Sequence, residues 1–255
     1  MNAGSIASGS FTGARSVNGN NKLDLSNSDQ DIPHRIIGLT SYSTSFGAKN
    51  GGAVQFSLGY EGLQSRILGF NPYTYTYNGD MNGDGIAGND LLFVPNNAAD
   101  LTFEDIKDAN GVVTTSAAQQ VDLFETYIKQ DKYLDSRRGK YTERNGGILP
   151  WLHRFDLAVS RDFWVKLGKS EKRNSIQFRV DIFNVGNLLN SDWGVGRRFV
   201  ATSPLQYRSV TATGVPVYRV ASQLLNPATN KTVDYSASTL TDVWNLQLGI
   251  RYTFE

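Results

Sequence analysis

The chain has no cysteine among its 255 residues. Disulfide bonds, thiol catalysis and cysteine-ligated metal sites are therefore excluded. No stretch approaches the run of about 18 apolar residues that marks a membrane-spanning helix. The formal net charge of +1 gives no electrostatic reason to expect nucleic acid as a partner. The sequence also lacks nucleophile-elbow, zinc-protease and phosphate-loop motifs, so we predict that it is not an enzyme.

The first 31 residues are rich in Gly, Ser and Asn and show no basic segment followed by an apolar one. No secretory signal is visible, and we predict a polar loop over residues 1–32. An exported protein that starts in this way would be a piece of a longer chain.

The most informative pattern lies at the C-terminus, in residues 244–254. Apolar and polar residues alternate there over about eleven positions, which predicts a strand with one apolar and one polar face. Its length suits a strand that crosses a bilayer at a tilt, about 9–11 residues. Trp244, Tyr252 and Phe254 near its ends suit the two interfaces of a membrane. The last strand of a soluble β-sandwich is the alternative.

Apolar and polar residues also alternate, as clearly as in 244–254 or less regularly, in six further segments. These segments predict strands at 34–46, 54–60, 155–160, 176–182, 199–210 and 215–221. Short turns at 48–52, 166–174 and 211–214 alternate with long connections at 1–31, 78–150, 187–196 and 223–241. This alternation is typical of outer-membrane barrels, which have short periplasmic turns and long extracellular loops. Single-chain bacterial barrels use even numbers of strands, so about seven strands indicate part of a larger sheet.

Charged residues on the polar faces of these strands exclude a buried sandwich core on that side. A water-filled lumen tolerates them, as does an open solvent face. We predict that the lumen-facing residues are Arg154, Asp156, Arg179, Asp181 and Arg251. Arg161 instead shares the parity of the apolar face, so we expect it to reach an interface or to follow a β-bulge.

The long segment 78–150 contains an amphipathic helix near 117–134 and an acidic loop. That loop begins D-M-N-G-D-G, which matches the start of an EF-hand. Side-chain oxygens would come from Asp80, Asn82 and Asp84, and a carbonyl from Ile86. Asp90 lies one residue before the usual bidentate position. The loop is therefore either a weak calcium site or an Asx/Gly turn without an ion.

Four passages carry a family pattern. They are YNGDMNGDGIAGNDLLFVP at 77–95, the YL, RRG, ERN and PW groups within 133–154, DIFNVGNLLNSDWG at 181–194, and LGIRYTF at 248–254. Taken together, they resemble the C-terminal region of TonB-dependent outer-membrane receptors of the SusC-like and Oar-like type from Bacteroidota. The resemblance covers residues 33–255.

The resemblance implies an all-β fold: the last strands of a 22-stranded antiparallel transmembrane barrel with a plugged lumen. The C-terminus would be periplasmic, and residues 1–32 and 78–150 would be extracellular loops. Such receptors import glycans, peptides or other large nutrients with energy delivered through TonB. The plug and the TonB box are absent from this sequence, and no substrate-binding residue is indicated.

The implied partners are outer-membrane lipids, the plug and remaining strands, TonB acting through them, and a SusD-like surface lipoprotein. The membrane-interface aromatics would be Trp151, Trp244, Tyr252 and Phe254. Two other hypotheses stay open: a soluble all-β ligand-binding or adhesin module with a calcium-stabilised loop, and a self-contained porin, which the odd strand count disfavours.

Overall fold

The computed structural model describes residues 13–19, 22, 24–28, 31–47, 50–64, 67–68, 71–166, 173–235 and 242–254. The chain is mostly β, with 45% of its residues in strands and 14% in helices. The sheets are predominantly antiparallel, and the β-rich prediction is confirmed. It forms two compact units. The helical unit comprises Met1–Pro33, Ser65–Leu149 and Arg198–Asp234. The sheet unit comprises His34–Gln64, Pro150–Arg197 and Tyr235–Glu255.

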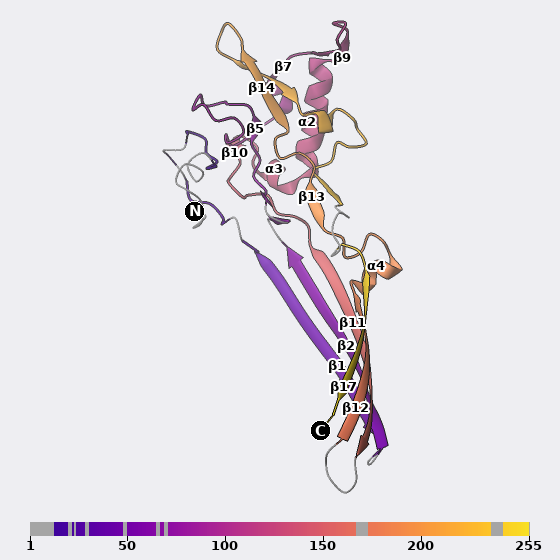
Figure 1. The fold of residues 1–255 in the computed structure, drawn as a ribbon. Coiled ribbons are helices and arrows are strands. Elements are labelled where there is room, and N and C mark those ends of the chain that lie inside the picture. Colours follow the sequence, from indigo (N-terminus) through magenta and orange to yellow (C-terminus); the bar gives the residue numbers. More distant parts are fainter. Residues whose placement is uncertain are drawn as a thin grey trace. The chain divides into compact units, whose positions relative to one another are not determined.

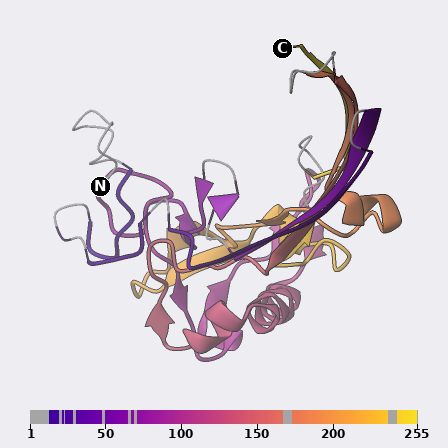
Figure 2. The same cartoon turned by 90° about the horizontal axis from the view of Figure 1, so that it is seen from below.

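The sheet unit contains one antiparallel sheet of five long strands in the order β1-β2-β11-β12-β17 (Figure 1). These strands are β1 (His34–Phe46), β2 (Asn50–Gln64), β11 (Leu152–Lys166), β12 (Arg173–Phe183) and β17 (Asn245–Thr253). Their registers run without a bulge, and the sheet is curved (Figure 2). Among the described residues, β1 and β17 pair on one side only and form the two edges of the sheet.

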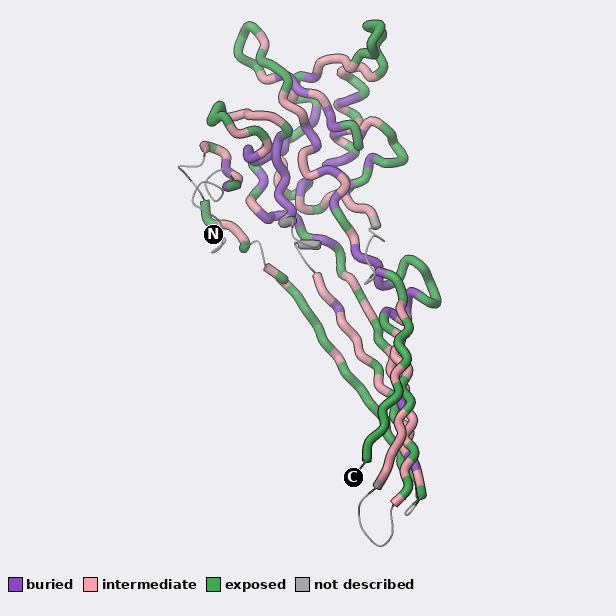
Figure 3. Tube along the Cα trace, in the orientation of Figure 1, coloured by how far each residue is buried: buried purple, intermediate pink, exposed green. Residues whose placement is uncertain are grey.

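Directly opposed residues of antiparallel strands share a face, so the registers define an apolar face and a polar face of this sheet. The apolar face comprises Ile36, Tyr42, Phe46, Val54, Phe56, Leu58, Tyr60, Phe155, Leu157, Val159, Phe163, Val165, Ile176, Phe178, Val180, Ile182, Leu246, Leu248, Ile250 and Tyr252. Many of these side chains are exposed, and Leu248 keeps 70% of its surface accessible. Figure 3 shows the long strands mostly exposed or intermediate, while buried residues gather in the helical unit.

The short connections of the sheet lie at one end of it and the long connections lie at the other. Residues 47–49 join β1 to β2 and residues 167–172 join β11 to β12, and β17 ends at that same end of the sheet. The connections from β2 to β11 and from β12 to β17 leave the opposite end and are long. The predicted alternation of short turns and long connections therefore holds for this sheet.

Among the described residues the long sheet has five strands, and two of the seven predicted strands do not belong to it. The hairpin β14 (Leu205–Val210) and β15 (Pro216–Val220) joins β5 (Tyr77–Asn78) and β7 (Thr102–Phe103) in a four-stranded sheet of the helical unit. The opposed pair Leu205 and Val220 is buried in the core of that unit. Alternation alone cannot distinguish such a strand from one with an exposed apolar face.

The helical unit is organised around α2 (Ala117–Gln130). Ser116 starts this helix with a capping box, because its side chain accepts from Gln119 N and Gln119 reaches back to Ser116 N. Phe124, Tyr127 and Ile128 recur at helical spacing and are fully buried. Among the described residues, no helix is both long and apolar enough to cross a membrane.

The predicted helix over 117–134 is two helices, because Asp131 interrupts it. The Asp131 carboxylate accepts a hydrogen bond of 2.8 Å from Tyr133 N and caps α3 (Lys132–Ser136). The remaining elements are β3 (Ile67–Leu68), β4 (Asn71–Pro72), β6 (Phe93–Val94), η1 (Ala98–Asp100), β8 (Ile106–Lys107), β9 (Val113–Thr115), β10 (Lys140–Tyr141), α4 (Val185–Leu189), β13 (Arg197–Phe199), η2 (Ser222–Leu224) and β16 (Val233–Tyr235).

The predicted division into a loop over 1–32 and a barrel region over 33–255 stays a prediction. Within the long connections, residues 65–149 and 198–234 form a unit with its own apolar core. Ser16 belongs to that unit, since its N donates to Asn89 O at 3.0 Å and its O accepts from Leu91 N at 2.9 Å. Ser26 and Asn27 also contact this unit, through hydrogen bonds with the side chains of Arg144 and Asn145.

One ion pair fixes α2 to the segment that follows α3. Both carboxylate oxygens of Glu125 accept hydrogen bonds from the Arg138 guanidinium, at 2.7 and 2.9 Å, and one also accepts from Ala98 N. These contacts lower the pKa of Glu125 from its usual 4.5 to about 2, with the Arg138 hydrogen bonds as the largest cause.

This pair should make the helical unit acid-sensitive. Because the pKa of Glu125 is lower in the folded chain, its contribution is complete above about pH 4.5 and is lost as the pH falls towards 2. After allowance for solvent screening, we expect a loss of about 1–2 kcal/mol. Urea unfolding followed between pH 6 and pH 2 measures it, and the Glu125→Gln variant should lose this part of the pH dependence. An equal slope in both proteins would contradict the assignment.

Candidate functional site

The loop of residues 184–197 follows β12 and carries most of the DIFNVGNLLNSDWG motif. Asn184 begins it in the left-handed conformation, with φ of 53°. The Asn184 N donates to Asp156 Oδ1 at 2.7 Å, and its Nδ2 donates to Gly194 O at 3.1 Å. A short asparagine tolerates this conformation because its side chain can hydrogen-bond locally. Asn184 thus joins the two ends of the loop.

A buried carboxylate fastens the end of the same loop. Asp242 accepts from Gly196 N at 2.9 Å and pairs with Arg154 Nη2 at 3.3 Å. The Arg154 Nε also donates to Gly194 O, at 3.4 Å. Asp242 lies far from the motif in the sequence, and sequence reasoning missed it because no local pattern marks its partners.

Asn187 holds the middle of the loop and is also buried. Its Nδ2 donates to Ser191 O at 2.8 Å and to Trp193 O at 3.1 Å, and its Oδ1 accepts from Trp244 N at 3.2 Å. The side-chain N–H groups of Asn184 and Asn187 are therefore satisfied by the loop and its anchors, whereas Asn184 Oδ1 is buried without a hydrogen-bond partner. The asparagines and Gly194 serve to hold a fixed shape.

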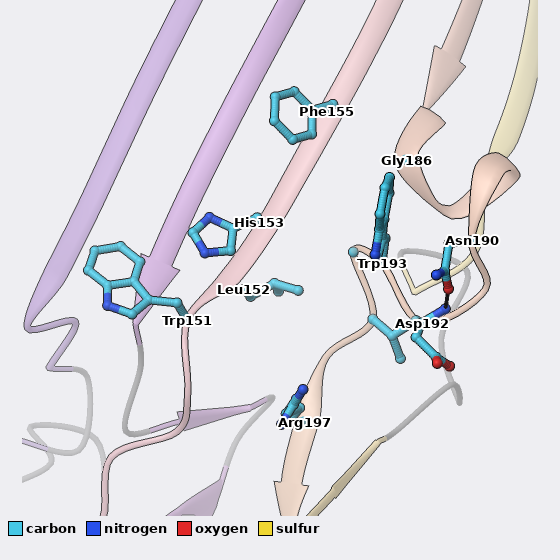
Figure 4. Close-up of a pocket in the computed structure, with 11 residues that line it drawn as sticks. Trp151, Leu152, His153, Phe155, Gly186, Asn190, Asp192, Trp193 and Arg197 are labelled. Atoms are coloured by element: carbon cyan, nitrogen blue, oxygen red, sulfur yellow. Dashed lines mark hydrogen bonds between the residues drawn. The ribbon is translucent and has the colours of Figure 1, made fainter.

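That shape encloses one side of a pocket with a volume of about 610 Å³ (Figure 4). Along β11 the wall is aromatic, and across from it stand residues of the 184–197 loop. The lining residues are Trp151, Leu152, His153, Phe155, Gly186, Asn190, Asp192, Trp193, Gly194, Val195 and Arg197. The volume lies in the range of sites for small ligands, about 300–1,000 Å³.

The aromatic wall extends across neighbouring strands. His34 and His153 each stack on Trp151 with ring centroids 6.0 Å apart, and Tyr60 packs on Phe155 at 5.0 Å. The Tyr60 hydroxyl and His153 Nδ1 lie 2.8 Å apart and share a hydrogen bond. Both histidines are thus accounted for by contacts within the wall.

The predicted lumen residues all lie on the polar face of the sheet, and most have structural partners. Arg179 and Asp181 form a bidentate pair at 2.7 and 2.8 Å, and Arg154 and Asp156 fasten the 184–197 loop. Arg251 shares this face by its register with Gln177. That the polar face lines a lumen stays a prediction.

Arg161 lies on the apolar face as its parity indicated, and no bulge accounts for it. The register is continuous through its pairs with Val54 and Phe178. Its guanidinium lies over the rings of Phe46 and Phe163, at 4.6 and 4.9 Å from their centroids. These are cation–π contacts, and they hold the charge near the short-turn end of the sheet. The bulge explanation is therefore wrong.

The four predicted interface aromatics fall at opposite ends of the sheet. Trp151 and Trp244 lie where β11 and β17 begin, and Tyr252 and Phe254 lie at the short-turn end. All four are exposed. The arrangement agrees with two aromatic girdles, although their contact with lipid stays a prediction.

The acidic loop has the geometry of linked Asx turns. Asp80 accepts from Gly83 N and Gly85 N at 2.7 and 2.9 Å, Asn82 from Asp84 N, and Asp84 from Ile86 N. A hydrogen bond from Asn89 is the main cause of the lowered pKa of Asp84. In the described part of the chain, no three acidic or histidine side chains are placed to hold one metal ion.

Asp90 is placed differently from a fifth ligand. It is buried, and its carboxylate accepts from Met81 N at 2.6 Å, which closes the base of the loop. Burial raises the pKa of Asp90 above its usual value. The donor types fit calcium, but the oxygens of Asp80, Asn82 and Asp84 are engaged with backbone amides.

Calcium binding therefore stays a prediction with a weak expected affinity. We expect a dissociation constant of about 10⁻³ M, at the weak end for extracellular calcium modules. Thermal unfolding with added calcium should show a rise in midpoint for the natural sequence and none for Asp84→Asn. Magnesium serves as the ionic-strength control. Equal midpoints with calcium and magnesium would leave the loop as a turn without an ion.

No protein-family model matches the chain, and no curated protein or solved structure matches it either. The functional argument therefore depends on the motifs and on the geometry of the sheet and the loop.

Proposed function

We propose that the chain is the C-terminal part of the barrel of a TonB-dependent outer-membrane receptor of the SusC-like or Oar-like type. Such a receptor imports large nutrients, for example glycans or peptides, with energy supplied through TonB. The sheet unit is then a portion of the barrel wall. The long connections, which contain the helical unit, are then extracellular segments.

The observation that carries the proposal is the exposed apolar face of the long sheet. It extends over all five strands, and its side chains include Phe56, Phe178, Leu246, Leu248 and Ile250, all of them exposed. Soluble monomers rarely expose apolar patches beyond a few hundred Å². A lipid-facing wall needs such a face, together with a polar face turned to the lumen.

The dimensions of this face fit a bilayer. Trp151 directly precedes β11 and Phe163 lies near the other end of this strand, twelve positions further along the chain. Twelve steps of about 3.3 Å give roughly 40 Å along the strand. A strand tilt of about 40° reduces this to roughly 30 Å across the membrane. That is the thickness of the hydrocarbon core.

The direction of the strands fits the same proposal. The short connections and the end of β17 share one end of the sheet, and both long connections leave the other. Outer-membrane barrels place short turns in the periplasm and long loops outside. The C-terminus is then periplasmic.

The first experiment separates a membrane protein from a soluble module. The chain is refolded from urea into phosphatidylcholine vesicles and, in parallel, into buffer without lipid. We expect protease-protected β-structure in vesicles and aggregation in buffer. A monodisperse, folded chain in buffer would instead support the soluble ligand-binding module and overturn the proposal.

The receptor assignment has its own test. DNA upstream of the codon for Met1 should encode a plug, a TonB box and further barrel strands. Uptake then has to be measured with the complete receptor, since the present sequence has no TonB box. An upstream region that encodes nothing of this kind would overturn the transport assignment while leaving the membrane assignment in place.

A further inference from the structure

We propose that the pocket between β11 and the 184–197 loop binds the head-group end of a membrane lipid. This inference rests on the proposed function, because it requires the apolar face of the sheet to lie in a bilayer. It adds a specific lipid site at the end of the sheet that is opposite the short turns.

One wall of the pocket is apolar and the facing wall is polar, as the binding of an amphiphile requires. Its β11 wall, with His153 and Phe155, belongs to the same side of the sheet as the apolar face. Across from this wall, Asn190, Asp192 and Arg197 supply amide, carboxylate and guanidinium groups (Figure 4). An acyl chain can follow the apolar face while hydroxyl or phosphate groups of the head reach the polar residues.

Trp193 is presented to solvent on a rigid backbone. Its side chain is 56% exposed, yet Trp193 N donates to Asn190 O at 3.0 Å and Trp193 O accepts from the buried Asn187 side chain. A loop with this many internal hydrogen bonds fixes the ring instead of letting it collapse onto the protein. Tryptophan favours membrane interfaces because one end of the ring is apolar and the other carries an N–H donor.

The helix α4 in the same loop adds apolar surface. Leu188 and Leu189 are both exposed, and Leu189 keeps 79% of its surface accessible. Together with Trp193 they give this 14-residue loop, 184–197, three large exposed apolar side chains. Neither leucine is among the residues that line the pocket. We commit to a lipid because the pocket wall continues through His153 and Phe155 into the apolar face of the sheet, which an acyl chain can follow and a free saccharide cannot use.

The test uses the full chain in detergent micelles with added lipid A, and native mass spectrometry to measure the retained lipid. We expect Trp193→Ala to weaken lipid binding about tenfold, the scale for losing roughly 1.4 kcal/mol of aromatic contact. Trp193→Phe, which keeps a ring, should retain most of the binding. Tyr252→Ala is the matched control, because it removes an equally exposed aromatic from the far end of the apolar face, and it should change binding less than twofold.

Four results would overturn the inference. Equal loss of lipid in Trp193→Ala and Tyr252→Ala would show general contact with the micelle and no pocket. Unchanged binding in Trp193→Ala would remove the role of the ring. Binding of the acyl-free bisphosphorylated glucosamine disaccharide of lipid A as tightly as lipid A itself would make the site a saccharide site. A chain that does not enter micelles at all would overturn the proposed function as well, whereas the first three results leave that function intact.

Discussion

Replacing Leu248 with Arg is expected to destabilise the chain in a bilayer by about 2–4 kcal/mol, the penalty for a basic residue on the lipid face near the midplane. Leu248 lies about halfway along the edge strand β17, opposite Val180, and is 70% exposed. In a soluble protein, a change at so exposed a position would alter stability by only about 0.5 kcal/mol. The two hypotheses for this chain therefore predict different results for one substitution.

The adjacent position provides the control. Gln247 lies on the polar face, where its register partner is Asp181, so Gln247→Arg places the same charge on the side away from lipid. We expect this variant to fold into vesicles as well as the natural sequence does. Folding into vesicles across a urea series, read by tryptophan emission and protease protection, measures both changes. Equal effects of the two substitutions would mean that the apolar face does not lie in hydrocarbon.

Gly194→Ala is expected to disrupt the 184–197 loop and to cost roughly 3 kcal/mol or more. Gly194 has φ of 67°, where an L side chain is strained. A Cβ at this position would also overlap the carboxamide of Asn184, which itself joins both ends of the loop. Relief requires Asn184 to move, and its hydrogen bonds to Gly194 O and Asp242 O would be lost.

Gly186 offers the matched control within the same loop. It lies on α4, has no positive φ, and a Cβ there would meet Trp193 atoms at 3.8 Å, an ordinary contact. Alanine is preferred to glycine in a helix by about 1 kcal/mol, so Gly186→Ala should be neutral or slightly stabilising. Urea unfolding from vesicles, followed by the total tryptophan emission, reports on both variants. A tolerated Gly194→Ala would show that the loop is not held as described.

The long strands could be predicted well from the sequence because each of them has one polar face and one apolar face. Alternation is strict over 54–61 in β2, 154–160 in β11, 176–182 in β12 and 245–253 in β17, and it is broken in β11 at Arg161. It was less regular in β1, where Ile37 and Leu39 lie on the polar face opposite Glu61 and Gly59. The hairpin of β14 and β15 shows the limit of the method, since its partners β5 and β7 are distant in sequence and only tertiary pairing assigns it to the helical unit.

The candidate site was less accessible to sequence reasoning. The resemblance singled out the motif over 181–194, but not the reason for its asparagines. Asn184 is bonded to Asp156 and Asp242, which are 28 and 58 residues away. Such contacts depend on the fold of the sheet, and one sequence carries no local signal for them. The break in the predicted helix at Asp131 could have been predicted from the sequence, because Asp is a preferred N-cap residue.

The two edge strands of the long sheet have a consequence for biogenesis. The outer sides of β1 and β17 present backbone N–H and C=O groups with no partner strand among the described residues. In water such edges recruit other chains and promote aggregation, and in hydrocarbon each unsatisfied group costs several kcal/mol. Under the proposed function, the chain alone has to satisfy these edges in vesicles by pairing with further copies of itself. In the complete receptor the neighbouring strands take the place of those copies, so closing both edges belongs to the assembly of the barrel.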